Sequence, residues 1–116
     1  MNGLALTPMV ALLAGSLLGA TGQVLLKLGA DGAVQLEDFL NPTVAAGLAV
    51  YGLGTILWIW ALSRVPLNVA YAFTALTFLL VYMASAFVIG ERLPLLACLG
   101  LIFVISGFAL LALAPR

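Results

Sequence analysis

The first long apolar run of the sequence carries a stripe of small and polar side chains that suits a bound polar ligand. At about 100° per residue, positions three, four, seven or eleven apart share one face of a helix. The residues at this spacing are Ser16, Gly19, Gln23 and Lys27. We interpret the stripe as the lining of a polar cleft, with Lys27 near one surface to receive an anionic headgroup. The alternative is that Lys27 only reaches out to water and Gln23 bonds to a neighbouring helix.

Two more apolar runs carry aromatic and hydroxyl side chains on one face. Within residues 67–89 this face consists of Tyr71, Thr74, Phe78, Tyr82 and Ser85, with Thr77 at its edge. Within residues 43–62 it consists of Gly47, Tyr51, Gly54, Thr55 and Trp58. Aromatic rings with polar tips can hold a sugar or an amphiphile. Aromatic residues at a membrane interface and hydrogen bonds between helices would give a similar pattern, which is the alternative interpretation.

The three faces together predict one shared cavity. Its predicted substrate-binding residues are Lys27, Gln23, Ser16, Gly19, Tyr51, Trp58, Tyr71, Thr74, Thr77, Phe78 and Tyr82. We expect binding and transport here, not catalysis, and we expect no cofactor. The chain has no histidine, and its single cysteine, Cys98, can form no internal disulfide and cannot build a metal site alone.

The fourth apolar run has a different kind of face. Gly100 and Gly107 are seven residues apart, with Phe103 and Val104 between them on the same side. Small residues at such spacing let two helices approach closely in a membrane. We predict a dimer interface at these four residues, and packing within one chain is the alternative.

The composition of the sequence indicates the environment in which these helix faces lie. Of 116 residues, 66% are hydrophobic and 7% are charged, whereas a soluble chain is about 45–50% apolar and about 25% charged. A soluble domain of this size could not bury so much apolar surface, so the sequence indicates an integral membrane protein. Four cations balance four anions, so no basic face for nucleic acid is expected.

The positions of the charges in the sequence bear on the transport mechanism. All eight lie at the ends of the apolar runs or in the connections: Lys27, Asp31, Glu37, Asp38, Arg64, Glu91, Arg92 and Arg116. Proton- or sodium-driven pumps commonly hold a carboxylate near the middle of the membrane. The sequence therefore argues against a pump driven by a carboxylate in the membrane.

Four transmembrane helices are predicted, at about residues 4–27, 43–62, 67–89 and 94–114, in a single domain over residues 1–116. An all-α up-down bundle follows, because only helices satisfy the backbone of such continuous apolar runs in lipid. We expect the first run to be retained, since it lacks a basic leader and exceeds the usual length of about 7–15 residues in a signal peptide. Four helices make half a transport pathway, so a second subunit, in an antiparallel dimer, is expected.

The sequence resembles the small four-helix branch of the drug/metabolite transporter superfamily. The resemblance covers nearly the whole chain. It rests on five pieces: residues 22–27 (Gly-Gln-Val-Leu-Leu-Lys), Val65-Pro66 before Ala70-Tyr71, Leu76-Thr77-Phe78, Gly90-Glu91-Arg92-Leu93, and Gly100 with Gly107.

Two subfamilies of this branch compete. Small multidrug resistance exporters are antiparallel, proton-coupled dimers, and Gly100 with Gly107 matches their dimerisation motif. Their essential glutamate would fall at Gly19 and their third-helix tryptophan at Thr74, so this sequence lacks both. The flippase subunits for undecaprenyl-phosphate-linked aminoarabinose share the pattern at Gly22, Gln23 and Lys27. Their Ala-Tyr and Leu-Asn-Phe pieces also match, except that Thr77 replaces the asparagine.

The resemblance favours a flippase of the bacterial inner membrane that moves a polyprenyl-phosphate-linked sugar or a similar amphiphilic anion. It implies a homodimer or a heterodimer with a similar small subunit. Two other functions stay open: a small-molecule exporter like the multidrug proteins, and a non-transporting accessory subunit of a membrane complex.

Overall fold

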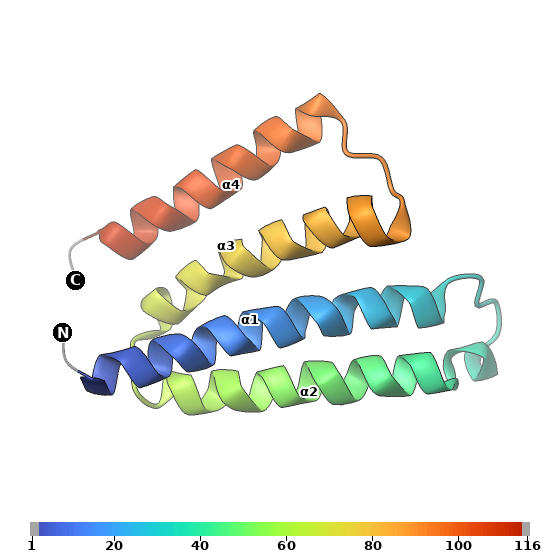
Figure 1. Ribbon diagram of the computed structural model, residues 1–116, viewed down its shortest axis with the longest axis horizontal. Helices are drawn as coiled ribbons and strands as arrows, with labels where there is room; N and C mark the ends of the chain where they lie inside the picture. Colours follow the sequence, from blue (N-terminus) through green and yellow to red (C-terminus); the bar gives the residue numbers. More distant parts are fainter. Residues whose placement is uncertain (1–2, 115–116) are drawn as a thin grey trace.

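The computed structural model describes residues 3–114 of the chain, and this part is entirely helical (Figure 1). The order is α1 (Gly3–Ala30), a short 3-10 helix η1 (Leu36–Phe39), α2 (Pro42–Leu62), α3 (Leu67–Ala84), one π-helical segment η2 (Ser85–Ile89) and α4 (Leu95–Leu113). Consecutive long helices run in opposite directions (Figure 1). The predicted all-α, four-helix fold is confirmed, and the dimer stays a prediction.

Among residues 3–114, three stretches are long and apolar enough to cross a membrane: Leu6–Ala30, Pro42–Leu62 and Leu67–Ile89. The apolar stretch Leu95–Leu111 of the fourth helix is shorter. At 1.5 Å per residue, the 19 residues of α4 span about 28 Å, which is close to the thickness of a hydrocarbon core. The chain is a multi-pass membrane protein.

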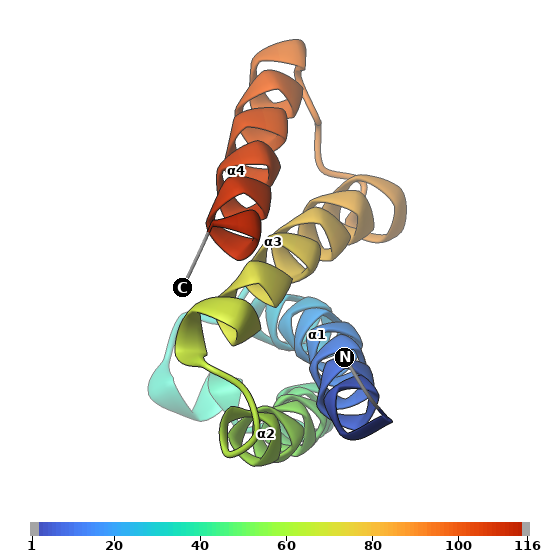
Figure 2. The same ribbon diagram turned by 90° about the vertical axis from the view of Figure 1, so that its left-hand side faces the viewer.

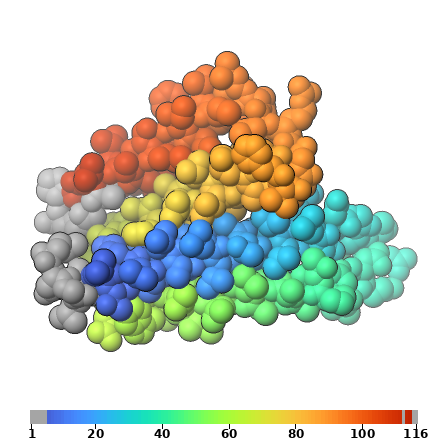
Figure 3. Space-filling view, in the orientation of Figure 1, coloured from blue at the N-terminus to red at the C-terminus, as the bar shows by residue number. Residues whose placement is uncertain are grey.

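Helices α1 and α2 pack tightly because glycines bring their backbones together. A Cβ atom on Gly22 would lie 2.8 Å from the Cβ and 2.9 Å from the backbone nitrogen of Tyr51. About two turns earlier along α1, a Cβ on Gly54 would lie 3.1 Å from the backbone oxygen of Gly15. The space-filling view shows the two helices in contact along their length (Figure 3). Among the described residues, α1 and α2 form the most extensively packed pair of helices.

Helix α3 lies between this pair and α4 (Figure 2). Its first half packs on α1 and α2 around Leu12, Ala61 and Ala70, which are fully buried. The Ser16 hydroxyl of α1 donates a hydrogen bond of 3.2 Å to the backbone oxygen of Phe73. Helix α4 packs against α3, where the rings of Phe78 and Phe108 lie 6.5 Å apart. A site between α1, α2 and α3 is therefore positioned by the first half of α3, which packs on the other two helices.

The connection between α1 and α2 is ordered by two polar side chains. Asn41 caps α2 by accepting a hydrogen bond of 2.9 Å from the Val44 backbone N–H, and its amide donates to the backbone oxygens of Gly29 and Asp38 at 3.0 Å each. The Asp38 carboxylate accepts the backbone N–H groups of Gln35 and Val34, which lowers its pKa below the usual 3.8. The contribution of Asp38 to stability is therefore present above pH 3.8 and is lost as the pH falls through the lowered pKa.

Replacing Asn41 by alanine is expected to lower the free energy of unfolding by about 1–2 kcal/mol, because an N-cap and two further hydrogen bonds are lost. Asn41→Asp keeps the capping oxygen but removes the donating amide. It should therefore fall between the wild type and Asn41→Ala in a chemical unfolding titration in nanodiscs. Equal stability of all three proteins would contradict this role of Asn41.

The helix ends differ in places from the predicted ones. Helix α1 continues to Ala30, three residues beyond residue 27, so Lys27 lies within its last turn. Helix α3 changes to a π-helix at Ser85, and Gly90 ends it with a φ of 86°, a conformation that favours glycine. Arg116, one of the eight charges considered above, lies outside the described residues.

Candidate functional site

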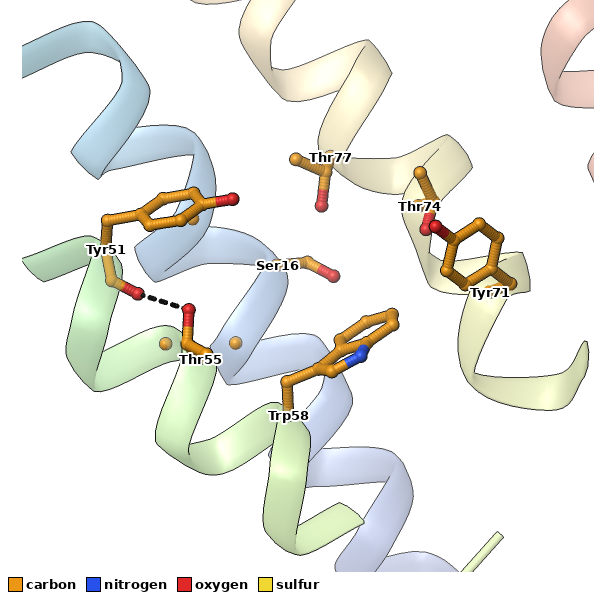
Figure 4. Close-up of a pocket in the computed structure, with 10 residues that line it drawn as sticks. Ser16, Tyr51, Thr55, Trp58, Tyr71, Thr74 and Thr77 are labelled. Atoms are coloured by element: carbon orange, nitrogen blue, oxygen red, sulfur yellow. Dashed lines mark hydrogen bonds between the residues drawn. The ribbon is translucent and has the colours of Figure 1, made fainter. Parts of the chain in front are cut away.

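A polar cavity of about 350 Å³ lies between α1, α2 and α3, in the size range of ligand sites. Figure 4 shows side chains from α2 and α3 facing each other across it. Its lining residues are Gly15, Ser16, Gly19, Tyr51, Gly54, Thr55, Trp58, Tyr71, Thr74 and Thr77. The cavity is open to its surroundings, because Tyr51 and Tyr71 remain 41% and 53% exposed.

The sequence places these residues by simple helical spacing. On α2, Tyr51, Thr55 and Trp58 are four and three residues apart and so point to one side. Glycines on the same side let α1 form the floor of the cavity, since Gly15 and Gly54 are in backbone contact. On α3, Tyr71, Thr74 and Thr77 are each three residues apart and line the opposite wall.

Some of the hydroxyl groups that line the cavity already form hydrogen bonds, within one helix or between two helices. The hydroxyl of Ser16 donates to Phe73, that of Thr55 donates to the Tyr51 backbone oxygen at 3.0 Å, and that of Thr77 donates to Phe73 at 3.5 Å. Trp58 and Tyr71 meet edge to face, with ring centroids 6.3 Å apart. This aromatic contact fixes the two rings at one end of the cavity.

Other hydroxyl groups that line the cavity are available to a ligand. Within residues 3–114, no hydrogen-bond partner is found for the hydroxyls of Tyr51, Tyr71 and Thr74. Together they can donate to and accept from a polyhydroxylated or amino-substituted headgroup. Among the described residues, no carboxylate lines the cavity.

The structure brings seven of the eleven predicted binding residues to this cavity. They are Ser16, Gly19, Tyr51, Trp58, Tyr71, Thr74 and Thr77. The cavity adds Gly15, Gly54 and Thr55. Of these, Gly54 and Thr55 already lay on the predicted face of α2. Gly15 is four residues before Gly19, and this spacing of small residues was the signal that could have found it.

The other four predicted residues lie away from the lining. Gln23 and Lys27 follow Gly19 by four and eight residues, which is about 6 and 12 Å along α1, and both are exposed. Lys27 forms a long ion pair with Asp31, with 4.0 Å between Nζ and Oδ1. Phe78 packs against Phe108 of α4, and Tyr82 lies one turn further along α3, exposed.

The fold and the cavity define a class: a small multi-pass helical membrane protein with a polar cavity between apolar helices. The chain belongs to the family of 4-amino-4-deoxy-L-arabinose-phosphoundecaprenol flippase subunits. It is 34% identical to the probable subunit ArnE of Yersinia pseudotuberculosis over 116 residues, which covers 97% of both chains.

Two further relatives carry similar names. The probable subunit ArnE of Pseudomonas aeruginosa is 36% identical over 108 residues, or 86% of this chain and 92% of the relative. The probable subunit ArnF of Shewanella sediminis is 36% identical over 93 residues, or 71% of this chain and 64% of the relative. No family model and no solved structure matches the chain. The relatives are named as subunits of a transporter and not as enzymes.

Proposed function

We propose that this chain is a subunit of a flippase that moves a polyprenyl-phosphate-linked sugar, of the aminoarabinose kind, across the bacterial inner membrane. The observation that carries the proposal is the polar cavity between apolar helices, in a chain of the flippase subunit family. Such a cavity offers polar partners to a headgroup while it crosses the bilayer, which lowers the free-energy barrier of its desolvation.

Each group has a role in this proposal. The hydroxyls of Tyr51, Tyr71 and Thr74 form hydrogen bonds with the sugar, and the Trp58 ring packs on its apolar face. Lys27 binds the lipid phosphate at the membrane surface reached by the end of α1, and Gln23 lies between this surface and the cavity. No covalent step takes place, and no cofactor is required. The direction of transport comes from consumption of the lipid or from its gradient.

The test is translocation in proteoliposomes. The lipid-linked aminosugar is placed in one leaflet, and its amine is then titrated with a membrane-impermeant amine reagent. With the reconstituted protein, we expect the lipid to exchange between leaflets much faster than in empty vesicles. Thr74→Val removes one cavity hydroxyl with little change of shape and should slow the exchange about tenfold. Exchange no faster than in empty vesicles, with the partner subunit also supplied, would sink the proposal.

The same vesicles separate the flippase from a proton-coupled exporter. An exporter of the multidrug kind would move small cations in response to a pH gradient across the membrane. We expect no such uptake, because the carboxylates of the described residues lie in the connections. Uptake of a cationic dye that follows the pH gradient would favour the exporter instead.

A second subunit binds to α4 in this proposal. The α4 face with Gly100 and Gly107 is open: a Cβ on either glycine meets nothing within 4 Å, and Phe103 is 76% exposed. Gly107→Leu should weaken dimerisation about tenfold or more in a membrane association assay. Ile102→Ala, on the opposite face of the same helix, is the matched control and should leave the association unchanged. Equal association of Gly107→Leu and wild type would show that this face is not the interface.

A further inference from the structure

A second hollow of about 590 Å³ lies between the start of α3 and the end of α4. We call it the α3–α4 groove, and it is lined by Leu67, Asn68, Tyr71, Phe108 and Leu111. Its lining is almost entirely apolar, in contrast to the cavity described above. Figure 2 shows how α4 stands apart from the α1–α2 pair, with α3 between them.

The α3–α4 groove adjoins the polar cavity, because Tyr71 lines both. The Tyr71 ring meets Trp58 on the cavity side, and the same residue forms one wall of the groove. A polar compartment and an apolar compartment thus share one amphipathic side chain. Such a pair of compartments suits a ligand with a polar head and an apolar chain.

A lipid whose headgroup occupies the cavity must pass its chain sideways into the bilayer, because 350 Å³ holds a headgroup only. The chain cannot leave between α1 and α2, since Gly15 and Gly54 bring the two backbones into contact there. On the α3 side, the Phe78–Phe108 contact closes the groove toward the middle of the helices. One open path leads along the groove, toward the end of the molecule that holds the α2–α3 turn.

We propose that the α3–α4 groove binds the first isoprene units of a polyprenyl phosphate lipid while its headgroup occupies the polar cavity. This inference rests on the proposed function. Tyr71 stands at the junction, where the phosphate ester of the lipid joins head and chain. The groove lies toward the end of the molecule opposite Lys27. The lipid therefore binds in the groove and contacts Lys27 with its phosphate at different stages of transport.

A pair of variants on α4 tests the groove. Leu111→Trp fills it from the α4 side, whereas Ile102→Trp places a tryptophan on the opposite face of α4, which does not line the groove. Leu111 is 61% exposed and Ile102 is 59% exposed, so both positions tolerate a large side chain. Leu67→Trp fills the groove from the α3 side and serves as a second variant if Leu111→Trp does not fold.

The probe is farnesyl phosphate with a photoreactive diazirine in its chain, and phosphatidylglycerol with a diazirine in an acyl chain reports general contact with the bilayer. In nanodiscs, we expect farnesyl phosphate to label the segment with Phe108 and Leu111 about tenfold more than phosphatidylglycerol does. Leu111→Trp should reduce this labelling about tenfold and slow lipid exchange, whereas Ile102→Trp should change neither.

The outcomes separate the groove from the proposed function. Selective farnesyl phosphate labelling without any lipid exchange would support the groove and count against the flippase. Lipid exchange that is equally fast in Leu111→Trp and wild type would overturn the groove alone. Equal labelling by both probes would show that ordinary phospholipid fills the groove. Loss of dimer in Leu111→Trp, with labelling unchanged, would show that a second copy of the chain occupies it. Either result overturns the inference.

Discussion

Reversing the charge of Lys27 is expected to reduce lipid translocation about a hundredfold, and Lys27→Ala about tenfold. A hydrogen bond to a charged group contributes about 1.5–3 kcal/mol, and each 1.4 kcal/mol corresponds to a factor of ten. Alanine removes the attraction for the lipid phosphate, and glutamate adds a repulsion in its place. Lys27→Arg keeps the charge and should retain most of the rate. The measurement is lipid exchange in proteoliposomes at matched protein content.

The matched control is Arg92, a cation in the connection between α3 and α4 at the same end of the molecule as Lys27 (Figure 1). Arg92→Glu makes the same change of charge near this surface but lies off the stripe of α1. It should change the rate by less than about twofold, because exposed charges are screened. If Arg92→Glu and Lys27→Glu slow exchange equally, the effect is one of surface charge, and the phosphate contact of Lys27 is refuted.

Replacing Asp31 is expected to have the opposite effect and to strengthen the binding of the lipid phosphate. It pairs with Lys27 at 4.0 Å, and both side chains are at least half exposed. Such a pair contributes at most about 1 kcal/mol, and a lipid phosphate would compete with the carboxylate for the same amine. Asp31→Asn should therefore bind the lipid phosphate about twofold to fivefold more tightly than the wild type. Weaker binding in Asp31→Asn would mean that Asp31 positions Lys27 for the phosphate instead of competing with it.

The helices and their polar faces were predictable because both depend on local spacing. Continuous apolar runs and the prolines at 42, 66 and 94 mark where the helices lie. The angular positions of Ser16, Tyr51 and Thr74 follow from their residue numbers alone. These local quantities were enough to predict that three helices would share one polar cavity.

The relative paths of the helices were not predictable in the same way. Gln23 and Lys27 have the right angular position on α1, but the cavity ends before them, because α3 diverges from α1 along its length (Figure 1). Phe78 lies on the polar face of α3 by spacing, yet it packs on α4. Crossing angles depend on which side chains meet, and spacing within one helix does not contain that information.

The contact between α1 and α2 gives the largest expected effect on stability. At Gly22, a new Cβ would lie 2.8 Å from the Cβ of Tyr51, 2.9 Å from its backbone nitrogen and 3.0 Å from its Cα. Backbone atoms of a helix cannot rotate away as a flexible side chain can. Gly22→Ala should therefore force α1 and α2 apart and lower the free energy of unfolding by about 1–3 kcal/mol. Gly22→Leu should prevent stable folding.

Gly52→Ala is the matched control, because it adds the same methyl group to α2 where a Cβ meets nothing within 4 Å. Alanine is also the better helix former by about 1 kcal/mol, so Gly52→Ala should leave stability unchanged or slightly raised. The difference between the two variants in a chemical unfolding titration isolates the close contact from helix propensity. Tyr51 also lines the cavity, so Gly22→Ala should slow lipid exchange as well. Equal stability of the two variants would mean that α1 and α2 do not pack through their backbones at Gly22.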